Sequence, residues 1–129
     1  MARKISRDAA AAFFVGTNFK RSNTKVVLDR DYGHVRMYLH GNLIAERGIH
    51  THGVKLRLAG WNTPTTRGRL NAILADDYRD QHFHQKDFTP HVDDIEVSDT
   101  QWVYFWGNDQ WGFDWDKPVP LAQMLESSK

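Results

Sequence analysis

The sequence predicts an α+β domain in which an antiparallel β-meander packs against one main helix. Three observations predict this fold class. Apolar and polar residues alternate between residues 24 and 58, which is the period of half-buried strands. The apolar spacing becomes helical between residues 64 and 78. Further on, two aromatic runs flank a turn sequence at residues 107–109, which indicates a hairpin. A chain of 129 residues has the length of one typical domain, so residues 1–129 are expected to form a single domain.

A short helix is expected near the N-terminus. Ser6 suits its N-cap, because a hydroxyl there accepts a hydrogen bond from a free backbone amide. The alanines that follow have the best helix propensity, and Gly16 suits a C-terminal stop. The apolar face of this helix would carry Ile5, Ala9, Ala12 and Phe13.

Four β-prone runs come next, namely NTKVVLD, HVRMYLH, NLIAERG and VKLRLAG. Gly41 and Asn42 fit a two-residue hairpin loop between the second and third runs. Val35, Met37 and Leu39 alternate with Arg36, Tyr38 and His40, so we expect one apolar and one polar face. These runs predict the meander.

The main helix is expected over about residues 64–78. Thr63 or Asn62 suits its N-cap, and Pro64 suits the first helical position. Glycine inside a helix costs about 1 kcal/mol relative to alanine, so we expect Gly68 to mark close packing against the sheet. The apolar stripe of the helix would carry Leu70, Ile73, Leu74 and Tyr78.

The last third of the chain is expected to contain short strands and one terminal helix. DQHFHQKDF and HVDDIEVSD predict either an edge strand with a loop or two short strands, separated by Pro90. QWVYFWGNDQWGFDW predicts a hairpin with Trp102, Tyr104 and Trp106 on one face of its first strand. The tail would form a short helix from about Pro118, with Leu121, Met124 and Leu125 as its stripe.

Charge and composition exclude several classes of protein. Lys and Arg number 17 and Asp and Glu number 16, so the chain is neither a strongly basic nucleic-acid binder nor an acidic DNA mimic. Bases dominate residues 2–69 and acids dominate residues 76–116, so the two halves either neutralise each other or orient the molecule on a partner. The chain has no cysteine, which excludes disulfides and thiolate zinc sites. No apolar run approaches the roughly 20 residues of a membrane span, so no membrane partner is expected.

The start of the main helix is a candidate binding site. Free backbone amides at a helix start favour anions, and Thr65, Thr66, Arg67 and Arg69 add hydroxyls and positive charge. A phosphate would suit that end, although the glycine spacing and lysine of a P-loop are missing. Alternatively, the threonines only cap the start of the helix, and the arginines face solvent or pair with acidic residues.

Aromatic residues are the second group of candidates. Trp61 precedes the main helix, and Trp106 and Trp111 belong to the hairpin. An exposed aromatic row can stack sugars, bases or a partner protein, whereas a buried one closes the core.

Histidine pairs are a weaker candidate for a metal site. His82 and His84, like His50 and His52, are spaced to share one face of a strand, and His91 lies near the first pair. No third ligand is fixed by this spacing, so exposed histidines are the alternative. The carboxylate pairs, such as Asp93 and Asp94, show no spacing that implies a cleft. No motif indicates a catalytic residue or a cofactor.

Three segments together resemble small accessory proteins of tailed double-stranded DNA phages, a group without an assigned activity. They are AAAAFFVGTNFKRSNTKV, MYLHGNLIA and AGWNTPTTRGRLNAIL, with a weaker likeness in HQKDF and the aromatic hairpin. The phrases SNT, LHGN and TTR-x-RLN carry the resemblance in this order. It implies a phage accessory protein in the host bacterial cytoplasm, and it brings no catalytic residues. The acidic, histidine-rich segment 76–99 departs from the pattern of the group.

These observations predict a non-enzymatic protein that binds and modulates a bacterial host protein, such as a defence or nucleic-acid-handling protein. The first alternative is a nucleic-acid-binding module that uses basic residues with an aromatic platform, namely Lys55, Arg57, Arg67 and Arg69. The second alternative is a metal-dependent enzyme that uses His82, His84 and His91.

Overall fold

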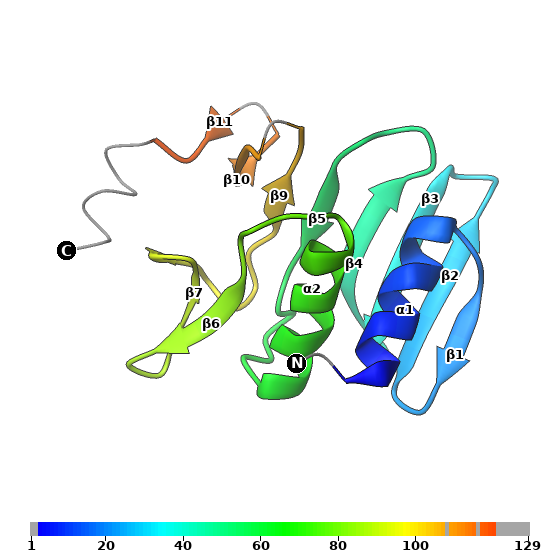
Figure 1. Ribbon diagram of the computed structural model, residues 1–129, viewed down its shortest axis with the longest axis horizontal. Coiled ribbons are helices and arrows are strands. Elements are labelled where there is room, and N and C mark those ends of the chain that lie inside the picture. Colours follow the sequence, from blue (N-terminus) through cyan, green and yellow to red (C-terminus); the bar gives the residue numbers. More distant parts are fainter. Residues whose placement is uncertain (1–2, 108, 116, 121–129) are drawn as a thin grey trace.

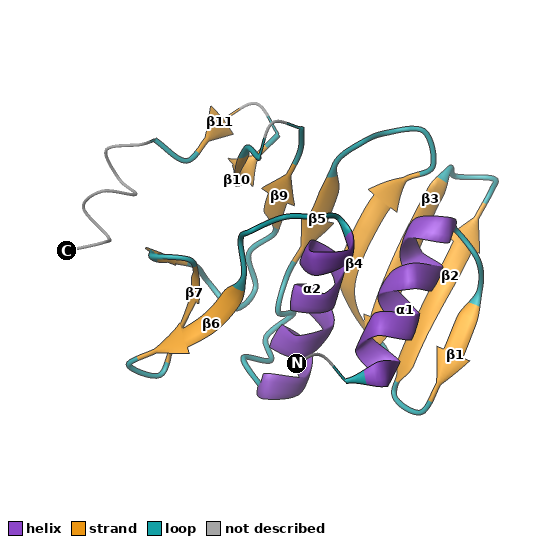
Figure 2. Ribbon diagram, in the orientation of Figure 1, coloured by secondary structure: helices purple, strands orange, loops and turns teal. Residues whose placement is uncertain are grey.

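The structure, a computed structural model, describes residues 3–107, 109–115 and 117–120. It consists of two helices and two antiparallel sheets (Figures 1 and 2). The elements, in chain order, are α1 (Lys4–Val15), β1 (Phe19–Arg21), β2 (Thr24–Asp29), β3 (His34–Leu39), β4 (Asn42–Gly48), β5 (Val54–Leu56), α2 (Pro64–Asp76), β6 (Phe83–Lys86), β7 (Thr89–Val92), β8 (Ile95–Glu96), β9 (Val103–Phe105), β10 (Trp111–Asp114) and β11 (Lys117–Pro118).

The large sheet has eight strands in the order β1-β2-β3-β4-β5-β9-β10-β11. Each strand is antiparallel to its neighbours, so the predicted meander is confirmed. The sheet then continues into the aromatic hairpin, because β5 pairs with β9 and brings Leu56 opposite Val103. This pairing joins segments that are separated in sequence by α2 and the whole small sheet.

Both helices pack side by side on one face of the large sheet (Figure 1). The sequence predicted one main helix with a minor one, but α1 has 12 residues and α2 has 13, and both contribute to the core. The alternation of β3 is confirmed, since Val35, Met37 and Leu39 are buried. Fully buried side chains of the core include Phe13, Met37, Leu56, Leu70, Ile73, Leu74 and Phe105.

The N-cap predicted for α1 was wrong. The N-cap position is held by Arg3, which makes no side-chain capping bond, and Ser6 is buried inside the first turns. Its hydroxyl accepts a hydrogen bond from Arg69 on the neighbouring helix. The predicted stop is confirmed, since Gly16 has a φ of 80° and its amide donates to the carbonyl of Ala12.

The start of α2 agrees with its sequence signals. Thr63 Oγ1 accepts a hydrogen bond from the amide of Thr66, and Pro64 occupies the first turn. Two expectations were wrong, however. A Cβ atom at Gly68 would meet nothing within 4 Å, so this glycine does not mark close packing. Tyr78, placed on the apolar stripe, is 95% exposed just beyond the helix end.

The tight turn between β3 and β4 lies one residue earlier than predicted. His40 and Gly41 form it, with φ values of 52° and 80°, and Leu39 pairs with Asn42. Positive φ at both central residues is the requirement of the turn type that matches the twist of a hairpin. Histidine tolerates this conformation better than most residues, which explains why the turn chemistry was misassigned.

The segment between α2 and β9 forms three short strands rather than one or two. They make a separate antiparallel sheet in the order β6-β7-β8, and Pro90 lies within its central strand. This small sheet adds Phe83, Val92 and Ile95 to the core, and the ring of Phe83 lies 6.3 Å from that of Phe105. It therefore extends the layer of the two helices.

The chain end was predicted as a helix from about Pro118. Lys117 and Pro118 instead form β11, which pairs with β10, so no helix begins at Pro118. The apolar stripe expected from Leu121, Met124 and Leu125 lies outside the described residues.

Candidate functional site: the open face of the large sheet

The face of the large sheet that points away from the helices carries the polar half of each alternating strand. We call it the open face and define it by Arg36, Tyr38, Glu46, Lys55, Arg57, Trp102 and Tyr104. Register places these residues side by side, since Arg36 pairs with Glu46, Glu46 with Lys55 and Lys55 with Tyr104. The side chains of β3 on the open face are half-buried. Those on the opposite face are buried, because both helices cover that face (Figure 1).

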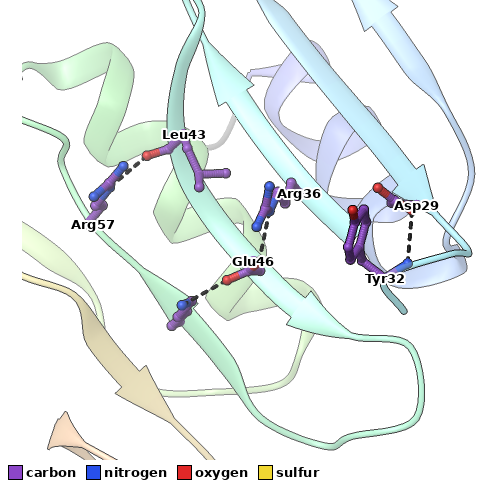
Figure 3. Close-up of polar contacts among 7 residues, drawn as sticks. Asp29, Tyr32, Arg36, Leu43, Glu46 and Arg57 are labelled. Carbon is purple, nitrogen blue, oxygen red and sulfur yellow. Dashed lines mark hydrogen bonds and ion pairs between the residues drawn. The ribbon is translucent and has the colours of Figure 1, made fainter. Parts of the chain in front are cut away.

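An ion-pair row crosses the middle of the open face (Figure 3). Glu46 accepts from Arg36 Nε at 2.8 Å through one carboxylate oxygen and pairs with Lys55 Nζ at 2.8 Å through the other. Burial works against the ionised carboxylate, but the hydrogen bonds from Lys55 and Arg36 outweigh it and lower the pKa of Glu46. The row thus contains two cations for one anion and keeps positive charge on this face.

Trp102 lies at the end of the row, close to two cations of β5. Lys55 Nζ is 4.7 Å and the guanidinium carbon of Arg57 is 4.4 Å from the centre of a Trp102 ring. Arg57 is fixed in this position because its Nε donates to the carbonyl of Leu43 at 2.9 Å (Figure 3). The face therefore presents a half-buried aromatic ring with two cations close to it.

More aromatic rings continue along β9. Tyr104 lies edge-on to Trp115 with ring centres 4.7 Å apart, and Trp106 lies 6.1 Å from Trp115. Trp106 is half-buried and Trp115 is 43% exposed, so both present ring surface to solvent. This arrangement of stacked planes and cations is the composition that single-stranded nucleic acids bind.

The family of the chain follows from one comparison. The family model of the Kyanoviridae Gp96 protein matches residues 2–112. The chain belongs to this family. No curated protein and no solved structure matches the chain. The match confirms a phage protein. It covers α1 to β9 and the first two residues of β10, so it includes every residue that defines the open face, whereas Trp115 lies beyond it.

The start of α2 carries less accessible charge than expected. Thr66 and Arg69 are buried, at 2% and 3% exposure; Thr66 contributes to the lining of a cavity, whereas Arg69 does not. Arg67 is half-buried and donates to Asn62 Oδ1 at 2.5 Å. Thr65 is half-buried and Trp61 is 58% exposed; both line a mostly apolar cavity of about 480 Å³ with Leu39, Ile44 and Leu58.

The hairpin tryptophans have different positions. Trp111 is 3% exposed and stacks on Phe105 at 6.0 Å, so it closes the core rather than offering a binding surface. Trp106 stays on the open face, and its ring nitrogen donates to Gln110 Oε1 at 2.6 Å. The structure thus separates two residues that the sequence placed in one candidate site.

The histidines of the small sheet do come together, but their nitrogens do not converge. The rings of His82 and His84 stack at 5.0 Å, and His91 lies 5.6 Å from His84. His84 Nε2 contacts the carbonyl of Asp93, and His91 Nδ1 contacts that of Thr89. Within the described ranges, no three His, Asp or Glu side chains form a group that could hold a metal ion.

Sequence reasoning missed the role of Arg47. Its Nε and Nη2 donate to the carbonyls of Phe13 and Phe14 at 2.8 and 2.9 Å, so Arg47 on β4 holds the C-terminus of α1.

The basic and acidic halves of the sequence do not neutralise each other through the ion pairs named here. Arg36 and Lys55 pair with Glu46, and Arg79 pairs with Asp77, so each pair stays within its own half.

Proposed function

We propose that this phage accessory protein binds single-stranded nucleic acid on the open face. The observation that carries the proposal is the ring of Trp102 with Lys55 and Arg57 close to it, next to the ion-pair row and the rings of Tyr104 and Trp106. Bases stack on aromatic planes, and the neighbouring cations neutralise the phosphates between them. This observation supports the nucleic-acid alternative over the metal-dependent enzyme, with the binding site on the sheet rather than at the start of α2.

A single strand suits the open face better than a duplex does. A duplex hides its base planes inside the stack, so the exposed rings would have nothing to stack on. A sheet surface with aromatic rings and modest net charge favours contacts to splayed bases over purely electrostatic contacts to a backbone. The near-neutral charge of the whole chain agrees with local rather than global attraction.

The test is fluorescence anisotropy with a labelled 12-nucleotide single strand, as DNA and as RNA, against a blunt duplex of the same sequence. We expect binding of the single strands at low salt. Trp102→Ala should weaken it about tenfold, because stacking of one base contributes about 1–3 kcal/mol. Trp102→Phe should retain most of the affinity, since a plane is kept.

A matched control is Lys4→Ala. Lys4 is an exposed cation on α1, on the helix side of the molecule, and it pairs with Asp8 at 3.0 Å. Its removal lowers the net charge as Arg57→Ala does but leaves the open face intact. Equal losses in Lys4→Ala and Arg57→Ala would contradict a defined site, and no binding of any strand at low salt would reject the proposal.

A bacterial host protein is the second candidate partner, with the host cytoplasm as the place of action. The cavity of about 480 Å³ beside Trp61 supports it, because an exposed tryptophan next to Leu58 and Ile44 suits an apolar side chain of a partner. Affinity capture from host lysate with wild type and Trp61→Ala tests this candidate. A host protein retained by wild type and lost with Trp61→Ala is expected; identical captures would argue against it.

A further inference from the structure

The open face contains a cleft at its other end, away from Trp102. The cavity has a volume of about 650 Å³, within the usual range for small-molecule sites. It lies where β3 begins, β4 ends and β5 begins, and its lining includes Tyr32, His34, Glu46, Lys55, Trp106 and Trp115. Of the residues that carry the proposed function, Lys55 lines the cleft, whereas Trp102 and Arg57 do not.

One side of the cleft is a stacked pair of rings. Tyr32 and His34 lie nearly parallel, with an angle of 9° and ring centres 6.1 Å apart. The turn that carries Tyr32 is held in place, because Asp29 Oδ1 accepts a hydrogen bond from the Tyr32 amide at 3.1 Å (Figure 3). Tyr32 is nonetheless 82% exposed, so its ring offers a free plane on a fixed backbone.

The other side of the cleft is formed by Trp106 and Trp115. Trp115 lies directly over the backbone of Gly53, where a Cβ atom would approach its ring to 2.3 Å. The absence of a side chain at Gly53 therefore lets the indole of Trp115 approach the backbone closely. The strands that carry His34 and Trp106 are three strand spacings apart, roughly 14 Å, which leaves room for a planar ring between the two sides.

The cleft also offers hydrogen-bonding groups between its aromatic sides. Glu46 and Lys55 are paired with each other at its floor. His34 Nδ1 has no partner among the described residues, but it is enclosed, as are the partnerless Gln81 Oε1 and Trp111 Nε1, so it does not mark a ligand site. A planar ligand with polar atoms on its edge fits the aromatic sides and the Glu46–Lys55 pair.

We propose that this cleft binds one unstacked nucleobase, between the Tyr32–His34 pair and the tryptophans Trp106 and Trp115. The inference rests on the proposed function, because a single-stranded nucleic acid bound at Trp102 can continue along β9 to the cleft. Trp102 and Trp106 are four residues apart, roughly 13 Å along an extended strand, so separate bases would occupy the two places. The phosphates then follow the cations of the open face.

The experiment uses two probes, adenosine monophosphate and the labelled 12-nucleotide single strand. The nucleotide is titrated while tryptophan fluorescence is recorded, because a base beside Trp106 and Trp115 should quench their emission. Tyr32→Ala and Gly53→Ala perturb opposite sides of the cleft. Tyr78→Ala is the matched control, since Tyr78 is an exposed tyrosine that does not line the cleft.

We expect quenching by the nucleotide in wild type and Tyr78→Ala, and its loss in Tyr32→Ala and Gly53→Ala. Each cleft variant should also bind the single strand about tenfold more weakly. Arg57→Ala should weaken the single strand but keep the quenching by the nucleotide. Thermal melts verify that each variant is folded, and Tyr32→Phe should restore both signals because it keeps the plane.

Two outcomes separate this inference from the proposed function. If Tyr32→Ala and Gly53→Ala respond like Tyr78→Ala in both assays, the cleft is not a base pocket, although strand binding that depends on Arg57 still stands. If the nucleotide quenches through Tyr32 but no strand binds at low salt, the cleft is a mononucleotide site and the proposed function falls. Quenching by a neutral hexose oligomer and not by the nucleotide would overturn the choice of a base.

Discussion

Arg69 Nη1 donates a 2.7 Å hydrogen bond to Ser6 Oγ, and this contact joins α2 to α1 inside the core. The Nε of the same guanidinium donates to Thr24 Oγ1 at 2.9 Å, so α2 is also fixed to β2. Each of these acceptors is a neutral hydroxyl. Burial lowers the pKa of Arg69, and the repulsion from Arg3 acts in the same direction. The arginine is therefore a structural link between three elements.

Arg69→Ala should lower the free energy of unfolding by about 3 kcal/mol, because it leaves two buried hydroxyls without their charged donor. Arg69→Lys should recover little of this loss, since a single ammonium cannot replace the fork of the guanidinium. Urea unfolding at pH 7 measures both. A loss below about 0.5 kcal/mol for Arg69→Ala, the range of ordinary surface changes, would contradict the structural role.

Gly68→Ala should stabilise the protein by about 0.5–1 kcal/mol, because alanine is the better residue in a helix interior. The added Cβ would meet nothing within 4 Å, so there is no steric cost to offset the gain. Gly53→Ala is the contrasting substitution, since its Cβ would lie 2.3 Å from the ring of Trp115. The melting temperature should rise for Gly68→Ala and fall for Gly53→Ala. A lower melting temperature for Gly68→Ala would contradict the open space around this glycine.

The stability of the protein should depend on the ionisation of Glu46. Its pKa is lower in the folded chain than the value of about 4.3 in an unfolded one. A lowered carboxyl pKa contributes stability above the unfolded pKa, and the contribution is lost as pH falls through the folded pKa. Glu46→Gln should therefore be less stable than wild type at pH 7, and the difference should shrink between about pH 5 and pH 3. Urea unfolding across this range measures it, and a constant difference would contradict the ionic origin.

The affinity of the open face for single-stranded nucleic acid should fall with salt in proportion to the number of phosphates that the protein neutralises. For single strands the slope of log K against log salt is about −0.7 per phosphate. Arg57→Ala should make the slope less steep by about 0.7, whereas Trp102→Ala should weaken binding and leave the slope unchanged. Anisotropy titrations between about 25 and 150 mM salt, where screening of exposed charges changes strongly, distinguish the two variants. Equal slopes for Arg57→Ala and wild type would mean that Arg57 contacts no phosphate.

Much of the fold could be predicted where the signal is local. The alternation of Val35, Met37 and Leu39 and the cap at Thr63 depend on neighbouring residues, and the structure confirms both. Ser6 and Gly68 show the limit of local patterns. A serine that begins a helical run looks like a cap, but its bond to Arg69 depends on a residue 63 positions away.

The open face could be predicted only in part. The period of two places Lys55 and Arg57 on one side of β5, and it places Trp102 and Tyr104 on one side of β9. It does not say that β5 and β9 are neighbours, because that pairing skips α2 and the small sheet. The start of α2 therefore looked like the stronger site, although Arg69 and Thr66 are used by the fold itself.

The pairing of β5 with β9 also bears on the order in which the molecule assembles. β1 to β5 follow one another along the chain, whereas the pairing of β5 with β9 closes the long loop that holds α2 and the small sheet, and such long-range closures slow folding. Lys55 and Trp102 lie on opposite sides of this junction. A ligand that contacts both would bind only the chain in which the junction is closed, so its binding energy would add to the free energy of unfolding.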